Sequence, residues 1–161
     1  MNEPQRETLV ALLQGSLGWL SPGGLAAVRT LAAAHGRLES ARFVAARLGL
    51  RDRHQLARLL KRDGLPSLED LAGWISVLNW VLGWEHRGAS LFEQALTSGR
   101  DPATCYRLVK RITGATWITV RNHGSGWVVL QLRDRCVIPK PDARTAHQQD
   151  HGRAGGARGS A

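Results

Sequence analysis

The sequence of 161 residues lacks most features of secreted or membrane-embedded proteins. Its two cysteines are too few to frame a disulfide-stabilised miniprotein and are most simply reduced thiols in a cytosol. No run approaches the roughly 18 uninterrupted apolar residues of a membrane-spanning helix. The N-terminal residues include acids where a signal peptide has a basic stretch. These absences predict a cytoplasmic, soluble protein without a membrane partner.

Aromatic residues are scarce at 6%, yet six of them are tryptophans, against one tyrosine and two phenylalanines. Apolar residues make up 43% and charged residues 22%, which is enough for a packed core. The 22 lysines and arginines exceed the 13 aspartates and glutamates, giving a formal charge of +9. A field of that sign favours polyanions, with nucleic acid ahead of an anionic membrane surface.

The C-terminal end differs from the rest in composition. Residues 139–161 are rich in glycine, alanine, arginine, glutamine and proline and have no periodic apolar pattern. We expect them to form a disordered basic tail, which either adds non-specific DNA affinity or is simply solvated. His147 and His151 are spaced four apart, but a disordered tail does not predict a metal site, and no cofactor is expected.

Local signals predict two helices in the first part of the chain. Leucines at helical spacing predict one over residues 8–17. Ser21 and Pro22 are a favoured N-cap and first helical residue, and Gly36 ends the second helix after about residue 35.

Two segments further along resemble each other. Residues 40–64 and 90–114 each combine a short amphipathic helix, a glycine suited to a left-handed helix end (Gly49 or Gly99), and a polar turn containing aspartate. Each then has a second helix that ends in a lysine–arginine pair before another glycine. The pattern predicts two helix-turn-helix units.

Between the repeats, Ser67 and Asp70 form a capping-box pattern at the start of a long helix. Apolar residues surround its axis, so it should be buried on several sides, with Trp74, Trp80 and Trp84 in or near the core. Residues 68–86 would span about 28 Å, close to the roughly 34 Å between successive major grooves on one side of B-DNA.

This arrangement resembles the DNA-binding domain of AraC/XylS-type transcription regulators, in which a long helix joins two helix-turn-helix units. That family has a signature like L-x-R-L-F-K-R-x-x-G, and residues 56–64 and 105–114 are similar to it. Residues 116–121 echo the family's helix after the second unit. The resemblance implies an all-α helical bundle with the DNA-binding domain at 22–121, a helical extension at 1–21 and a C-terminal extension at 122–138.

Asp52 and Asp101 are the expected N-caps of the second helix of each unit, the recognition helix. The resemblance and these caps place the same residues on the outer face of the two recognition helices. The candidates for base readout are Arg53, His54, Ala57, Arg58, Ala103, Thr104, Tyr106 and Arg107. Arg58 and Arg107 are the best direct readers, because a guanidinium can bond guanine O6 and N7 together. The candidates for phosphate contacts, with solvent exposure left open, are Lys61, Arg62, Lys110 and Arg111.

Two departures from the family pattern matter. The family places an apolar residue after the turn glycine, as Leu50 does, but the second unit has Arg100 there. We therefore expect the second turn to be looser and its groove contact to be weaker or confined to phosphates. The family's N-terminal sensor domain has no counterpart, so an effector pocket is not visible in the sequence. The first helix either caps the bundle or contacts another protein.

Other residues have simpler interpretations. Cys105 occupies an apolar position of the family pattern and should be a buried small hydrophobe. The segment around Trp127 is compatible with a strand or a helix. No nucleophile triad, phosphate-binding loop or carboxylate pair appears, so an enzyme is not expected.

The sequence thus predicts a sequence-specific regulator of transcription that binds double-stranded DNA. The transcription machinery or a sensor protein acting in trans are further candidate partners, and the oligomeric state stays open. The alternative is a helix-turn-helix scaffold that has lost DNA reading and acts as a protein-interaction module. RNA binding ranks third, because the sequence shows no exposed aromatic platform.

Overall fold

The computed structural model describes residues 3–138, and every regular element in that range is an α-helix. The helices in chain order are α1 (Glu3–Ser16), α2 (Pro22–Ala33), α3 (Ala41–Arg47), α4 (Arg53–Arg62), α5 (Leu68–Arg87), α6 (Leu91–Thr97), α7 (Pro102–Thr113), α8 (Trp117–His123) and α9 (Ser125–Arg135). The predicted all-α bundle is confirmed. The predicted tail at 139–161, with His147 and His151, lies outside the described residues.

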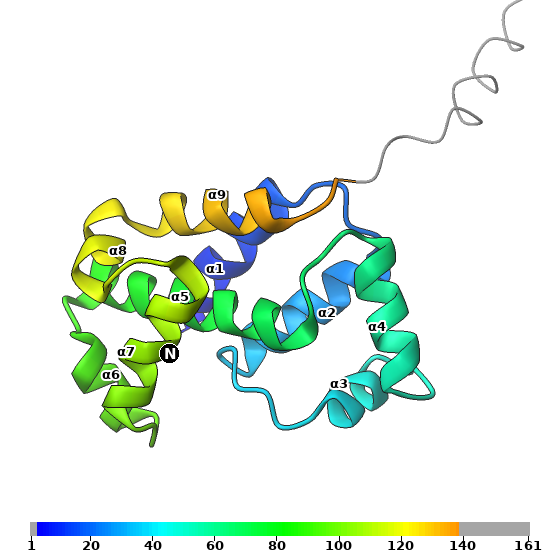
Figure 1. Cartoon of the computed structure of the whole chain (residues 1–161), viewed down its shortest axis with the longest axis horizontal. Helices are drawn as coiled ribbons and strands as arrows, with labels where there is room; N and C mark the ends of the chain where they lie inside the picture. The colour runs from blue at the N-terminus through cyan, green and yellow to red at the C-terminus, as the bar shows by residue number, and fades with distance from the viewer. Residues whose placement is uncertain (1–2, 139–161) are drawn as a thin grey trace, which may run out of the picture.

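Helix α5 is the centre of the bundle. Every residue from Leu71 to Gly83 is buried, and the helix contacts α1, α2, α6, α7, α8 and α9. Figure 1 shows the α3–α4 pair toward one end of α5 and the α6–α7 pair toward the other. The predicted buried central helix is therefore confirmed. Trp74 and Trp80 lie in its core, while Trp84 is partly exposed and its ring lies 4.3 Å from the guanidinium carbon of Arg121.

Helix α1 begins at Glu3, earlier than the helix predicted over residues 8–17. The extra turn is held by a polar contact, which apolar periodicity does not detect. Gln5 is buried, and its Nε2 donates to the backbone oxygen of Asn79 at 3.0 Å and to its Oδ1 at 2.9 Å. Leu9 and Leu13 are also buried, so α1 caps the bundle.

The segment around Trp127 forms the helix α9, which decides between the two predicted alternatives. Val128, Val129 and Leu132 are buried on the side that packs against α1 and α5. In the described part of the chain, the two predicted extensions thus share one hydrophobic core with residues 22–121. No helix between residues 3 and 138 combines the length and apolar character needed to cross a membrane.

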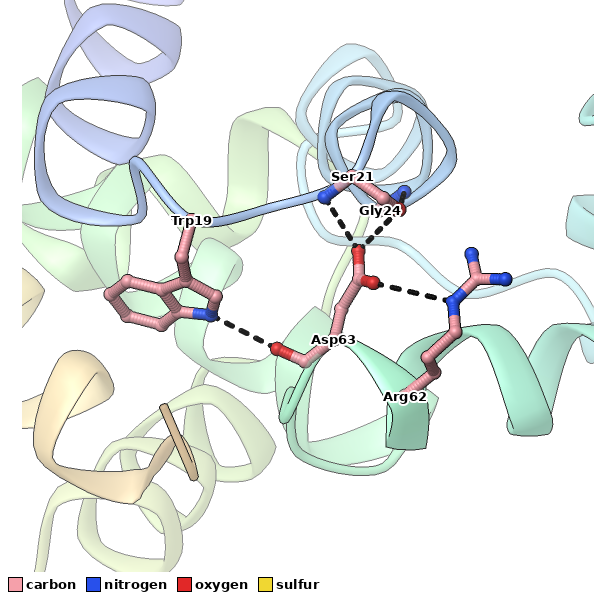
Figure 2. A network of polar contacts seen from close by, with 5 residues as sticks. All are labelled: Trp19, Ser21, Gly24, Arg62 and Asp63. Atoms are coloured by element: carbon pink, nitrogen blue, oxygen red, sulfur yellow. Dashed lines mark hydrogen bonds and ion pairs between the residues drawn. The ribbon is translucent and has the colours of Figure 1, made fainter. Parts of the chain in front are cut away.

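A network of polar contacts ties the end of α4 to the start of α2 (Figure 2). The carboxylate of Asp63 is buried, and it accepts hydrogen bonds from the backbone nitrogen of Ser21 at 3.0 Å and from its hydroxyl at 2.6 Å. The hydroxyl of Ser21 in turn accepts from the nitrogen of Gly24 and caps α2. Trp19 Nε1 donates to the backbone oxygen of Asp63 at 3.0 Å. The C-terminal end of α4 is therefore held against the segment that joins α1 to α2.

Candidate nucleic-acid interface

The first helix-turn-helix unit consists of α3, a tight turn and α4. Ser40 caps α3 by accepting a hydrogen bond from the nitrogen of Phe43 at 3.0 Å. The turn closes at Gly49, which has a φ of 69°, a conformation that glycine adopts without strain. The nitrogen of Leu50 then donates to the oxygen of Ala45 at 2.9 Å.

The second unit consists of α6, α7 and a turn of the same form. Gly99 has a φ of 68°, and the nitrogen of Arg100 donates to the oxygen of Ala95 at 2.9 Å. The expectation of a looser second turn is therefore wrong. The turn closes through the glycine and a backbone hydrogen bond from the residue that follows it. Any residue except proline can donate that bond, so arginine serves as well as leucine.

Aspartates define where α4 and α7 begin. Asp52 accepts from the nitrogens of His54 and Gln55 at 2.9 Å, and Asp101 accepts from the nitrogen of Thr104 at 2.8 Å and its hydroxyl at 2.7 Å. The hydrogen bond from Gln55 lowers the pKa of Asp52, and those from Thr104 lower the pKa of Asp101. Both caps stay ionised at neutral pH and fix the first turn, where the predicted base-reading residues lie.

The two helices bury and expose matching faces. Leu56 and Leu60 of α4 are buried, as are Cys105 and Val109 of α7, which confirms the interpretation of Cys105. Neither helix contains an acidic residue. All of the predicted DNA-contacting side chains are exposed: Arg53, His54, Ala57, Arg58, Lys61, Arg62, Ala103, Thr104, Tyr106, Arg107, Lys110 and Arg111.

The cations of the first unit have few internal partners. Within residues 3–138, the side chains of Arg53, Arg58 and Lys61 make no hydrogen bond or ion pair. The Nε of Arg62 lies 3.7 Å from the carboxylate of Asp63, which is itself held by Ser21. An external anion could therefore contact Arg53, Arg58 and Lys61 without displacing an internal partner.

The cations of the second unit are more engaged. Arg107 donates to the hydroxyl of Thr104 at 3.0 Å, which orients its guanidinium near the helix start. Lys110 donates to the backbone oxygen of Gly114 at 3.1 Å, and Arg111 pairs with Asp70 of α5 at 3.1 Å. A phosphate contact by Arg111 would thus compete with an existing ion pair.

The predicted DNA contacts leave out several exposed cations of the first unit. Arg42, Arg47 and Arg51 are further exposed cations of α3 and its turn. The sequence did contain a signal for Arg42 and Arg47, because basic residues precede the turn glycine in the first unit and not in the second. The structural role of Asp63 had no such signal, since its partner Ser21 is 42 positions away.

Two observations concern metal ligands and thiols among the described residues. No group of three or more histidine, cysteine, aspartate or glutamate side chains in residues 3–138 is placed to hold a metal ion. Cys105 and Cys136 are unpaired with each other, and burial raises the pKa of Cys136 to about 11, so its thiol stays protonated.

Comparisons with protein-family models, with curated proteins and with solved structures find no match for this chain. Function is therefore inferred from the geometry of the two units and from their charge.

Proposed function

We propose that this protein is a cytoplasmic, sequence-specific regulator of transcription that binds double-stranded DNA through α4 and α7. The observation that carries the proposal is the repetition of one arrangement. Two helix-turn-helix units with the same turn each expose a capped helix that has basic side chains and no acidic ones. In helix-turn-helix proteins that bind DNA, the N-terminal residues of the second helix contact base edges in the major groove.

The spacing of the units supports binding by both. The 20 residues of α5 separate them, and a helix of that length spans about 30 Å. Successive major grooves on one side of B-DNA are roughly 34 Å apart. We infer that α4 and α7 enter neighbouring grooves of one duplex.

The exposed residues divide into two roles. Arg58 and Arg107 would read guanine, while His54, Thr104 and Tyr106 would add hydrogen bonds and Ala57 and Ala103 would meet thymine methyl groups. Arg53 lies in the same first turn of α4. Lys61, Arg62 and Lys110 would contact phosphates, and Arg111 would do so after leaving Asp70.

The general test is a titration with DNA at several salt concentrations. The purified full chain should bind random-sequence duplexes, and log affinity should fall against log salt with a slope of about −5 if about six phosphates are neutralised. Fluorescence anisotropy of labelled duplexes measures this. Replacing both Lys61 and Arg62 by alanine should reduce the size of the slope by about 2. Absence of binding at low salt would exclude DNA as the partner.

The specific test concerns Arg58. Once a preferred duplex is selected from a random pool, Arg58→Ala should weaken its binding by about 1–3 kcal/mol and relax the preference at one base pair. Arg133→Ala is the matched control, because Arg133 is exposed on α9 and belongs to neither of the two helices proposed to read DNA. Equal affinity of the Arg58 variant and the parent would rule out direct readout by that residue.

A protein-interaction module is the second candidate, and one surface feature favours it. A mainly apolar groove of about 750 Å³ is lined by Leu65, Pro66 and the exposed Val137. Residues of α4 also line it, including the proposed DNA contacts Arg53, His54, Ala57 and Lys61. An apolar segment of another protein would fit such a surface. The salt titration separates the two candidates, because a scaffold that does not read DNA gives no steep salt dependence.

A further inference from the structure

A second cavity, of about 410 Å³, is lined by none of the residues proposed to contact DNA. Its walls come from α1, the connection between α2 and α3, α5, α6 and the turn that precedes α7. Binding sites for small molecules commonly have volumes of about 300–1,000 Å³. The cavity is therefore large enough for a small organic ion.

The lining of this cavity is mostly polar and carries an excess of positive charge. Arg37, Arg87 and Arg100 line it, and Glu93 is its only acidic lining residue. The carboxylate of Glu93 accepts from the nitrogen of Ser90 at 2.8 Å and from its hydroxyl at 3.0 Å, which completes the capping box of α6. Glu93 is thus already engaged in capping a helix.

Arg100 is the unusual member of the set. It is half-buried, its guanidinium carbon lies 5.5 Å from the centre of the Trp80 ring, and its Nη1 is 3.5 Å from the hydroxyl of Ser76. No carboxylate forms an ion pair with it within residues 3–138. Burial lowers the pKa of Arg100, the neighbouring Cys105 thiol raises it, and the positive charge of Arg37 lowers it. Buried charges in proteins normally have a partner of opposite sign.

The fold does not need an arginine at this position. Leu50 occupies the same place in the first unit, after a glycine of the same φ, and donates the same backbone hydrogen bond. An apolar side chain therefore suffices to close the turn. The guanidinium of Arg100 is an addition that the first unit lacks.

We propose that this cavity binds a small oxyanion, a phosphate or a polycarboxylate, held between Arg37 and Arg100. Guanidinium groups suit such ligands, because their planar donors can bond two oxygens at once. Arg37 belongs to the connection before α3, where it donates to the backbone oxygen of Ser98 at 3.2 Å, and Arg100 belongs to the turn before α7. A bound anion would bridge segments that lead into both helix-turn-helix units. The inference does not depend on the proposed DNA binding.

The test is isothermal titration calorimetry of the full chain, without DNA, at constant ionic strength in a chloride buffer. Inorganic phosphate and citrate are the two probes, and at least one should bind at a single saturable site. Their relative affinities distinguish a phosphate ligand from a polycarboxylate. The NMR signal of the Trp80 indole should shift on binding, while that of Trp127 in α9 serves as the internal control.

Substitutions decide whether the arginines are responsible. Arg100→Leu, which copies the residue of the first unit, should weaken binding of the probe by about tenfold or more. Arg37→Ala should do the same, and it removes only one hydrogen bond to a backbone oxygen. Arg133→Leu changes the charge equally on the surface of α9 and should leave the affinity unchanged. No binding of either probe, or equal losses in all three variants, would overturn the proposal.

Discussion

Gly36→Ala is expected to lower the free energy of unfolding by more than about 3 kcal/mol. Gly36 is buried and has a φ of 71°, which strains any residue with a Cβ atom. A Cβ there would also lie 2.6 Å from the backbone oxygen of Ala72 and 2.6 Å from the backbone nitrogen of Ser76. Both atoms belong to the central helix α5, whose backbone cannot move without disturbing the core.

Gly49→Ala is the matched control for this prediction. Gly49 has nearly the same φ, 69°, but no atom lies within 4 Å of the position of its Cβ. Its substitution should cost only about 1 kcal/mol, from backbone strain alone. Urea unfolding followed by circular dichroism measures both variants. Similar losses in the two would show that the close approach of residue 36 to α5 contributes nothing.

Asp63→Ala is the second large expected effect, a loss of about 2–3 kcal/mol in the free energy of unfolding. The substitution leaves the backbone nitrogen and the hydroxyl of Ser21 without their buried acceptor (Figure 2). It also removes a negative charge from the N-terminal end of α2, where the helix dipole favours one. The same unfolding measurement applies.

The control for Asp63 is Asp134→Ala. Asp134 is exposed on α9 and has no hydrogen bond or ion pair within residues 3–138, so its loss should change stability by less than about 0.5 kcal/mol. A comparably small change for Asp63→Ala would show that the contact between α4 and α2 does not stabilise the fold.

These two sites bear on function as well as on stability. Gly36 allows the chain that leads into α3 to pass close to α5, and Asp63 holds the end of α4 against α2. The first helix-turn-helix unit is thereby fixed at both of its ends. Helix α4 held in this way keeps its orientation relative to the second unit, which the proposed binding to two grooves would require.

Sequence reasoning succeeded where the signal is local. Ser21, Asp52 and Asp101 cap the helices that they were expected to cap, because a side-chain oxygen reaches a backbone nitrogen two or three residues ahead. Gly49 and Gly99 have the left-handed conformation that their positions predicted. The apolar pattern of residues 68–86 likewise indicated the burial of α5. DNA binding by the exposed faces stays a prediction.

Only the tertiary structure decided the remaining features. Gln5 extends α1 through a contact with Asn79, 74 positions away, and Arg111 is engaged by Asp70, 41 positions away. The helix α9 and the half-buried position of Arg100 against Trp80 also depend on neighbours from other helices. Capping, turn formation and amphipathic periodicity act over a few residues, so the amino-acid order specifies them by itself. The partner of a polar side chain depends on which distant segments the packed core brings together.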